Sequence, residues 1–345
     1  MREPAFWRDG GLAAWLLAPA AALYAAVADA RLARPGTRVS VPVLCVGNFT
    51  AGGAGKTPTA IALAGMAMAR GFRPHFLTRG HGGRARGPLA LQPGHTAREV
   101  GDEALLLGRT APTVIARDRA AGAALAIRNG ADLIVMDDGF QNPSLHKDVS
   151  LIVIDGMYGI GNGRTIPAGP LRASLEAQLR KADAILIAGP LSPAAQDTVS
   201  QARARGIPIL TGSLRPDPAA IDNLRGHALL AFAGIGRPDK FFATLHAAGL
   251  DVRETRAFAD HHPFTAAQAR ALLDTAARGN LTLVTTEKDI ARMRGDPALA
   301  PLAERARTLP VTMTFDDEAA VQREVIGKLT AGMPAAISPG RDGSA

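Results

Sequence analysis

Residues 50–57 of the chain read Thr50-Ala51-Gly52-Gly53-Ala54-Gly55-Lys56-Thr57. They follow the short apolar run 41–46, which has the composition of a buried strand, and they precede a stretch of helical period at 59–69. A glycine-rich turn between a strand and a helix is the context of a phosphate-binding P-loop. Thr50 stands where the generic pattern has its first glycine, but the Gly-Gly-x-Gly-Lys-Thr core is complete. The stretch therefore predicts a nucleotide site rather than a purely structural turn.

Each part of this loop has a role in binding phosphate, so residues 50–57 are the candidate nucleotide-binding residues. Glycines allow backbone N–H groups to curve around phosphate oxygens at the start of a helix. Lys56 would supply a positive charge to the β- and γ-phosphates, and the hydroxyl of Thr57 would bind Mg²⁺. The motif thus indicates ATP or a related nucleotide together with Mg²⁺.

An acidic pair, Asp137-Asp138, follows the apolar run 133–136. An acidic pair after a strand is often only a solvated loop, but beside a P-loop it is the expected position of a metal-binding carboxylate. The candidate metal ligands are therefore Thr57, Asp137 and Asp138. The sequence does not distinguish which aspartate contacts the metal.

Other short apolar runs recur along the first part of the chain, with alanine-rich stretches of helical period between several of them. Strands that alternate with helices predict a mainly parallel sheet covered by helices on both faces. The runs lie at 41–46, 74–78, 113–115, 133–136, 151–154 and 184–187. The predicted fold class is therefore α/β, of the doubly wound P-loop type.

A second, smaller α/β unit is predicted after a join near 215–225, where prolines interrupt the pattern. New strand-like runs occur at 228–233 and 281–285, with a helical stretch at 265–278 between them. Beyond about residue 331 the chain is too poor in apolar residues to be expected to fold. The predicted organisation is an N-terminal helix at 1–30, a P-loop unit at 31–220, a smaller unit at 221–330 and a disordered tail at 331–345.

The stretch 11–28 contains no charged residue. Three interpretations remain open: a helix that lies in a membrane interface, a helix packed on the protein, or a single membrane span. A cleaved signal peptide is disfavoured, because the charges before residue 11 cancel and secretion would separate the P-loop from cytosolic ATP. Arg31, Arg34 and Arg38 follow the stretch, as expected for contact with anionic headgroups.

The chain of 345 residues has 39 basic and 31 acidic residues, for a formal net charge of +8. A basic balance favours acidic partners such as phosphates, anionic lipid or nucleic acid. Aromatic residues make up only 4%, which disfavours nucleic acid because base stacking needs aromatic side chains. The single cysteine, Cys45, excludes an internal disulfide.

Taken together, the motifs resemble the tetraacyldisaccharide 4′-kinase family, the lipid A 4′-kinases. The resemblance begins with 47–58 and with Asp137-Asp138-Gly139-Phe140-Gln141, and it covers roughly residues 5 to 325. Departures from the family pattern are Ala54, His81 and Ala104, where the family has Thr, Tyr and Pro. Further matching segments lie at 78–83, 101–103, 167–172, 260–261 and 286–289.

The resemblance implies an ATP-dependent phosphotransferase with an alcohol acceptor. The expected acceptor is the 4′-hydroxyl of a tetraacylated glucosamine disaccharide 1-phosphate, which would give lipid IVA for lipopolysaccharide. ATP and Mg²⁺ are the implied cofactors, and the glycolipid and a membrane surface are the implied partners, with no protein partner. The implied location is the cytoplasmic face of the bacterial inner membrane, peripheral or with a single N-terminal anchor.

The resemblance also implies catalytic residues. By family position, Asp102 would accept the proton of the sugar hydroxyl, and His261 would orient or tune Asp102 across the two units. Arg117, Arg119 and Arg172 are candidates for holding phosphate oxygens, because a guanidinium offers a fixed fork of donors. For any single one of these arginines, an ordinary surface position is nearly as well supported.

Two other classes of protein compete with this interpretation. A P-loop GTPase or a partner-activated ATPase would share the Gly-Gly-x-Gly-Lys-Thr core, but the base-reading motif N-K-x-D or T-K-x-D is absent. Glu287-Lys288-Asp289 resembles that motif only superficially, because its lysine and aspartate are adjacent. A membrane-associated nucleic-acid binder would fit the charge but lacks any recognised nucleic-acid motif.

Overall fold

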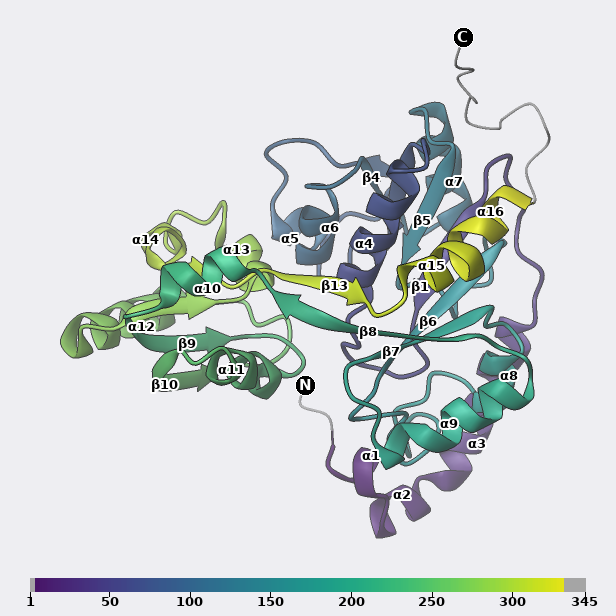
Figure 1. The fold of residues 1–345 in the computed structure, drawn as a ribbon, viewed down its shortest axis with the longest axis horizontal. Helices are drawn as coiled ribbons and strands as arrows, with labels where there is room; N and C mark the ends of the chain where they lie inside the picture. Colours follow the sequence, from purple (N-terminus) through teal and green to yellow (C-terminus); the bar gives the residue numbers. More distant parts are fainter. Residues whose placement is uncertain (1–3, 332–345) are drawn as a thin grey trace.

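Two β-sheets organise the chain in the computed structural model, which describes residues 4–331 (Figure 1). The larger sheet has nine strands in the order β13 (Val311–Phe315), β8 (Ile209–Pro216), β7 (Ala184–Ala188), β6 (Val149–Asp155), β1 (Val43–Gly47), β5 (Leu133–Asp137), β2 (Pro74–Thr78), β4 (Thr113–Ile115) and β3 (Leu89–Ala90). Its strands are parallel except for the pairs at its two edges, β13–β8 and β3–β4. The prediction of a mainly parallel α/β fold is confirmed.

Helices cover both faces of this large sheet. One face carries α4 (Lys56–Met68) and the C-terminal helices α15 (Glu318–Val321), η1 (Gln322–Ile326) and α16 (Gly327–Ala331). The other face carries α7 (Arg119–Arg128), α8 (Leu175–Leu179) and α9 (Pro193–Ala204). Two short helices, α5 (Ala97–Val100) and α6 (Asp102–Leu107), lie between β3 and β4 in the chain.

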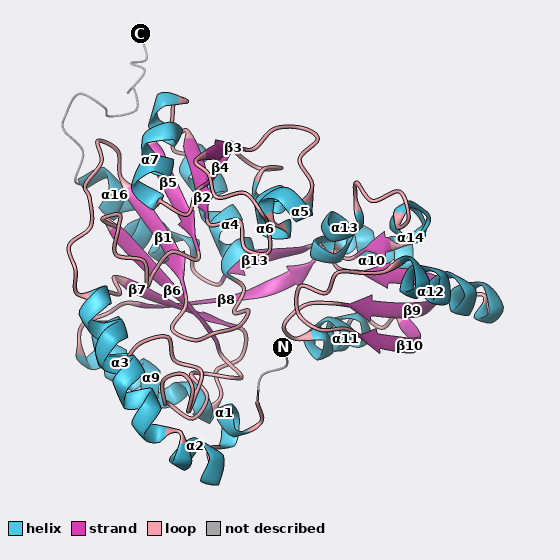
Figure 2. Ribbon diagram, turned by 180° about the vertical axis from the view of Figure 1, so that it is seen from behind, coloured by secondary structure: helices cyan, strands magenta, loops and turns pink. Residues whose placement is uncertain are grey.

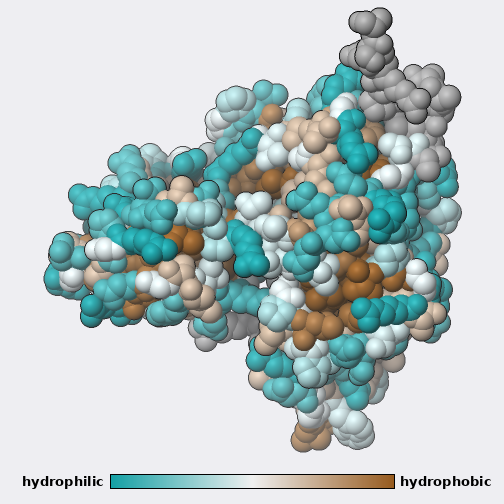
Figure 3. All heavy atoms as spheres, in the orientation of Figure 1, coloured by the Kyte–Doolittle hydropathy of each residue, from teal (hydrophilic) through white to brown (hydrophobic). Residues whose placement is uncertain are grey.

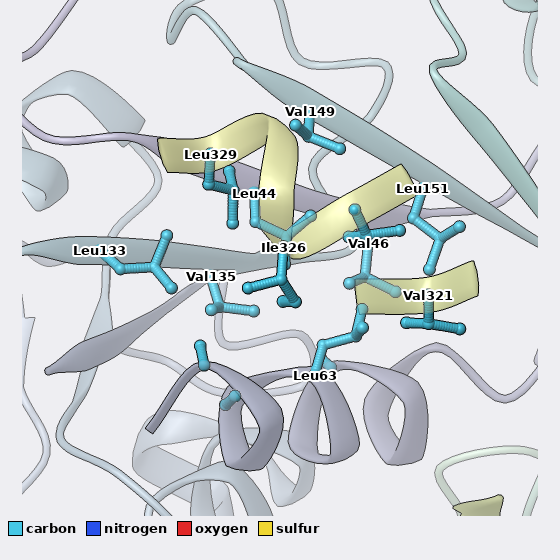
Figure 4. Packing of buried hydrophobic residues seen from close by; sticks show 14 of the residues in the cluster. Leu44, Val46, Leu63, Leu133, Val135, Val149, Leu151, Val321, Ile326 and Leu329 are labelled. Atoms are coloured by element: carbon cyan, nitrogen blue, oxygen red, sulfur yellow. The ribbon is translucent and has the colours of Figure 1, made fainter. Parts of the chain in front are cut away.

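Side chains alternate between the two faces of the sheet along each strand, which explains why helices pack on both faces. Leu44 and Val46 of β1 pack with Leu63 of α4, whereas Val43 and Cys45 pack on the opposite face. Figure 4 shows the first of these cores, with strand side chains between α4 and the C-terminal helices. Strands buried on both faces read as nearly continuous apolar runs, which is the pattern present in the sequence.

The smaller sheet is parallel throughout, in the order β10 (Asp251–Ala257), β9 (Ala228–Ala233), β11 (Thr282–Thr285) and β12 (Arg307–Thr308). One face is covered by α10 (Pro218–Leu224) and α11 (Pro238–Ala247). The other is covered by α12 (Ala266–Gly279), α13 (Glu287–Met293) and α14 (Ala300–Arg305). In Figure 2 this smaller unit lies to one side of the large one, at the end of β8 and β13.

The end of the second unit differs from the predicted boundary at 330. Residues 311–331 return to the large unit, because β13 pairs with β8 and Met313, Phe315 and Val321 are buried in its core. Periodicity alone could not assign these residues to one sheet rather than the other. The predicted tail at 331–345 lies outside the described residues apart from Ala331, the last residue of α16.

The N-terminal segment forms three short helices instead of the single predicted one: α1 (Phe6–Asp9), α2 (Leu12–Leu16) and α3 (Ala18–Leu32). Gly10 and Gly11, with φ of +76° and +93°, separate the first two, and Pro19 lies in the first turn of the third. Among residues 4–331, no helix combines the length and apolarity needed to cross a bilayer.

Candidate functional site

The P-loop lies between β1 and α4, at the carboxyl edge of the large sheet. Gly55 precedes α4 with φ of +89°, a left-handed conformation that favours glycine, and Gly52 has φ of +109°. The side chain of Asn48 donates a hydrogen bond to the carbonyl of Gly52 at 3.0 Å. The backbone N–H of Ala51 donates to the carbonyl of Pro170 at 2.8 Å, so a second loop supports the first.

Lys56 and Thr57, the first two residues of α4, are both buried. Lys56 Nζ lies 3.4 Å from the carbonyl oxygen of Gly52 and 3.7 Å from Oδ1 of Asp138. The hydroxyl of Thr57 donates to Oδ2 of Asp137 at 3.0 Å. This contact follows from the sheet order, because β5 lies next to β1 and pairs Asp137 with Val46. The structure therefore brings the predicted phosphate and metal groups together.

Asp137 has the properties of a cation ligand. Burial, reinforced by the negative charges of Glu103 and Asp138, raises its pKa to about 7. Its Oδ1 atom is buried and has no hydrogen-bond partner among the described residues. A buried, unpaired carboxylate oxygen beside a threonine hydroxyl fits Mg²⁺, which prefers oxygen ligands.

The donor set is small, as expected for a magnesium site that also uses substrate phosphates. Within residues 4–331 there is no group of three or more His, Cys, Asp or Glu side chains that could hold a metal ion unaided.

Asp138 is in a different electrostatic environment from Asp137. Arg172 Nη1 lies 2.7 Å from Oδ1 of Asp138, and Lys56 approaches the same oxygen. Burial alone would raise the pKa of Asp138, but the charges of Lys56 and Arg172 outweigh burial and hold that pKa well below its usual range. Asp138 is thus a stable carboxylate already paired with two cations. Asp137 is the better placed of the two for a metal ion.

The other two candidate arginines are in contrasting positions. Arg119, the first residue of α7, is 2% exposed, and its Nη1 donates to the carbonyl of Ala116 while its Nε has no partner in the described chain. Burial lowers the pKa of Arg119, and Arg79 lowers it further. A buried cation with a free donor is suited to an anionic oxygen. The side chain of Arg117 is exposed, and no contact within the described chain connects it to the P-loop.

Asp102 lies at the N-terminus of α6 and faces the smaller unit. It is 2% exposed, and its Oδ2 lies 3.4 Å from Nδ1 of His261. His261 is in a turn of the smaller unit with φ of +52°, and its ring contacts that of His81 with centroids 4.8 Å apart. The structure thus brings together the predicted pair from its two separate units.

The charges around this pair reinforce one another. Burial alone would raise the pKa of Asp102, but the hydrogen bond from His261 and the charges of Arg292 and Lys288 hold that pKa well below its usual range. The same hydrogen bond raises the pKa of His261, against the effect of burial. Asp102 is therefore ionised over the whole physiological range of pH.

At this interface, Arg292 was not singled out from the sequence, and Lys288 and Glu103 were included in matching segments without a predicted role. Lys288 Nζ lies 2.7 Å from Oε1 of Glu103, and Arg292 Nε lies 2.8 Å from Oδ2 of Asp102. Both cations are on α13, which lies against α6. Arg292 follows Asp289 by three residues, so helical spacing could have indicated that it shares a face with the T-E-K-D segment.

A second cross-unit contact lies on the other side of the P-loop. Asp155, at the end of β6 and 5% exposed, pairs with Arg237 and Lys240 at the start of α11. Nearby, a Cβ added to Gly236 would lie 3.8 Å from the backbone nitrogen of Gly53. The smaller unit therefore approaches the P-loop itself.

Comparisons with known proteins agree with this geometry. A family model described as Tetraacyldisaccharide-1-P 4′-kinase matches residues 13–330. A Tetraacyldisaccharide 4′-kinase of Rhodopseudomonas palustris (strain BisA53) is 53% identical over 332 residues, covering 96% of this chain and 97% of the relative. One of Methylobacterium sp. (strain 4-46) is 53% identical over 335 residues, covering 96% and 99%.

A crystal structure of LpxK from Aquifex aeolicus in complex with ATP has the same fold. Its TM-score to this chain is 0.71, at 23% identity, with 92% of this chain and 100% of that chain covered.

Proposed function

We propose that this chain, which belongs to the tetraacyldisaccharide 4′-kinase family, phosphorylates the 4′-hydroxyl of a tetraacylated glucosamine disaccharide 1-phosphate. As a member of this family it is a phosphotransferase of lipid A biosynthesis. The phosphoryl donor is ATP, and the proposed product is lipid IVA. The observation that carries the proposal is the position of Asp102, a buried carboxylate at the N-terminus of α6, which packs against α4, the helix that carries Lys56 and Thr57.

In the proposed arrangement, residues of this chain hold the nucleotide and its metal. The backbone N–H groups of 52–57 and the ammonium of Lys56 bind the β- and γ-phosphates. Thr57 and Asp137 would hold Mg²⁺, with Asp138 in support. Bound there, the ion neutralises negative charge on the phosphate oxygens during transfer.

Asp102 is the proposed general base. As the 4′-oxygen forms its bond to the γ-phosphorus, the bond to the β-phosphate oxygen breaks and ADP leaves. The hydroxyl proton passes to the carboxylate of Asp102, which is ionised and ready to accept it. His261 holds Asp102 in place from the other unit.

The three candidate arginines contribute to different degrees in this proposal. Arg172 balances the charge of Asp138 beside the metal position, and its backbone N–H donates to the carbonyl of Phe49 at 2.9 Å. Arg119 offers a buried donor to an anionic oxygen of a substrate. Arg117, which is exposed, would act only if the bound lipid reaches it.

Transfer of labelled phosphate from ATP to tetraacyldisaccharide 1-phosphate in detergent micelles tests the proposal directly. We expect a lipid product that carries the label and a requirement for Mg²⁺. Excess unlabelled ATP should abolish labelling, and excess GTP should not. Nucleotide hydrolysis without lipid labelling, or preferential competition by GTP, would instead favour a GTPase or a partner-activated ATPase.

We propose that the N-terminal helices bring the enzyme to the cytoplasmic side of the inner membrane as a peripheral protein. Asp29 of α3 accepts hydrogen bonds from Ser174, so one side of this segment is tied to the large unit. Large apolar side chains of the same segment are exposed: Leu12, Trp15 and Leu16 of α2, and Leu23, Tyr24 and Val27 of α3. Figure 3 shows hydrophobic surface at the lower tip of the molecule, where Figure 1 places α2.

Replacing Leu12, Trp15 and Leu16 together by serine is expected to weaken vesicle binding at least ~10²-fold, because each large side chain buried in lipid contributes about 1.5–3 kcal/mol. The readout is sedimentation with vesicles of phosphatidylethanolamine and phosphatidylglycerol. KM for micellar lipid should rise, while the affinity for ATP should not change. Met68→Ser, at the far end of α4, is the matched control. Equal vesicle binding by the triple variant and the control would refute the proposal.

A further inference from the structure

Arg292 lies at the boundary between the two units and contacts both of them. Its Nε lies 2.8 Å from Oδ2 of Asp102, and its Nη1 lies 2.7 Å from the carbonyl oxygen of Gly234 and 3.1 Å from Oδ1 of Asp289. Only 9% of the side chain is exposed. A third nitrogen, Nη2, is buried without a partner among the described residues. The guanidinium thus joins one carboxylate of the large unit to two groups of the smaller one.

Hydrogen bonds anchor the first turn of α13, the helix that carries Arg292. Asp289 is 0% exposed, and its carboxylate accepts hydrogen bonds from the backbone N–H of Gly234 and the hydroxyls of Thr285 and Thr286. Thr286 in turn caps α13 by accepting from the backbone N–H of Asp289. Because Arg292 lies one helical turn beyond Asp289, its guanidinium packs against the hydrogen-bonded carboxylate of Asp289.

The two carboxylate oxygens of Asp102 have different partners. Oδ2 is occupied by Arg292 and His261, which approach it from the smaller unit. Among residues 4–331, Oδ1 accepts one hydrogen bond, from the backbone N–H of Glu103 at 3.0 Å. A carboxylate oxygen can accept two hydrogen bonds, so Oδ1 keeps a lone pair for another donor.

We propose that Arg292 is a positioning residue for Asp102, which fixes Oδ2 so that Oδ1 is the oxygen presented to the acceptor hydroxyl. The inference rests on the proposed role of Asp102 as the base and adds a group that acts only through it. Within residues 4–331, the hydrogen bonds and ion pairs of Arg292 are with Asp102, Gly234 and Asp289, and none is with residues 50–57 or with Asp137. Because it belongs to the smaller unit, the carboxylate is held in this way only when the two units are together.

The charges around Asp102 determine how the loss of Arg292 would be observed. Burial acts to raise the pKa of Asp102, and the nearby cations oppose it. Without Arg292 the pKa of Asp102 rises, so the acidic limb of kcat/KM moves to higher pH. Other titratable groups lie around Asp102 and Arg292. The basic ones are Lys288, His261 and His81, and the acidic ones are Glu103, Asp260 and Asp289.

Arg292→Met is expected to lower kcat by up to ~10²-fold, the loss that follows when a reacting group is displaced by about 1 Å. KM for ATP should stay close to that of the unaltered protein, because the P-loop is untouched. Arg292→Lys keeps the charge without the fork of donors, so its loss should be smaller. Arg294→Met, two residues along and exposed, is the matched control and should behave as the unaltered protein does.

The decisive comparison places Arg292→Met in an Asp102→Ala background. If Arg292 acts only through Asp102, adding Arg292→Met to Asp102→Ala should leave kcat unchanged. A further large loss in that background would mean that Arg292 has a general structural role, and the inference would be wrong. It would also be wrong if Arg292→Met matched Arg294→Met in kcat and in its pH profile.

Two further outcomes are distinguishable. If Arg292→Met does not fold, as judged by thermal unfolding, Arg292→Lys provides the same test with the buried charge retained. If Asp102→Ala alone keeps most of its kcat, Asp102 is not the base, and the positioning role of Arg292 falls with that assignment. An inactive Asp102→Ala with fully active Arg292 variants would overturn only the present inference.

Discussion

Asp102→Ala is expected to lower kcat by ~10²–10⁴-fold, the usual contribution of a positioned general base, while the affinity for ATP changes little. The side chain lies at the N-terminus of α6, and none of its described contacts is with residues 50–57. The measurement is steady-state transfer to micellar lipid together with equilibrium binding of ATP. An Asp102→Ala enzyme that kept most of its kcat would end the assignment of Asp102 as the base.

The Asp102→Asn variant distinguishes two roles for Asp102: a general base that accepts the proton, and a carboxylate that only positions neighbouring groups. Asparagine keeps the shape and can still accept a hydrogen bond, but its amide cannot take up the proton of the hydroxyl. We therefore expect Asp102→Asn to be about as inactive as Asp102→Ala. Substantial activity in Asp102→Asn would mean that the carboxylate only positions other groups.

His261→Ala should be milder than either substitution of Asp102. Arg292 still occupies Oδ2 of Asp102 when the imidazole is removed, so the proton acceptor remains in place. Residues that act as one unit are non-additive, so the double variant should resemble Asp102→Ala alone. Losses that multiply would instead indicate that His261 has a task of its own at the substrate.

Lys56→Ala is expected to lower kcat at least ~10²–10³-fold, as the loss of a preorganised charge at the reacting group commonly does. Its ammonium is the buried cation within the P-loop, 3.4 Å from the carbonyl oxygen of Gly52. The fold should survive, because Asp138 keeps its pairing with Arg172. Lys181→Ala, at an exposed position, is the matched control.

Thr57→Ala should produce a loss of the same kind with a different dependence on metal. The hydroxyl that contacts Asp137 would be missing, so a higher Mg²⁺ concentration should be needed for half-maximal activity. Titration of Mg²⁺ at saturating ATP measures this shift. Near-normal transfer by purified Lys56→Ala would contradict the P-loop assignment, whatever the result for Thr57.

Local features of the sequence were sufficient for much of the fold. The apolar run before Thr50 and the helical period after Thr57 predict the strand–loop–helix that carries the P-loop, and both are present as β1 and α4. Asp137-Asp138 directly follows an apolar run, which predicts its position at the carboxyl edge of a parallel sheet. These inferences succeed because strand and helix periodicity, and the conformational freedom of glycine, act over a few residues.

Other features depend on contacts that no local pattern encodes. The N-terminal segment 1–30 was predicted as one helix, but Gly10 and Gly11 separate α1 from α2, and a new helix, α3, begins just before Pro19. Residues 311–331 have ordinary strand and helix patterns, yet they complete the large sheet because its edge strand β8 and an open core face accept them. Which sheet a strand joins is decided by the packing that is available to it.

The P-loop, the acidic pair and the family resemblance could all be identified from short stretches of sequence. The surroundings of Asp102 could not, because they form only when the two units pack together. Arg292 is 190 positions away along the chain, and it reaches the carboxylate because β8 and β13 hold the two units so that α13 lies against α6. Buried charges need partners of opposite sign, and the nearest partner in space can come from any part of the sequence once the units are packed together.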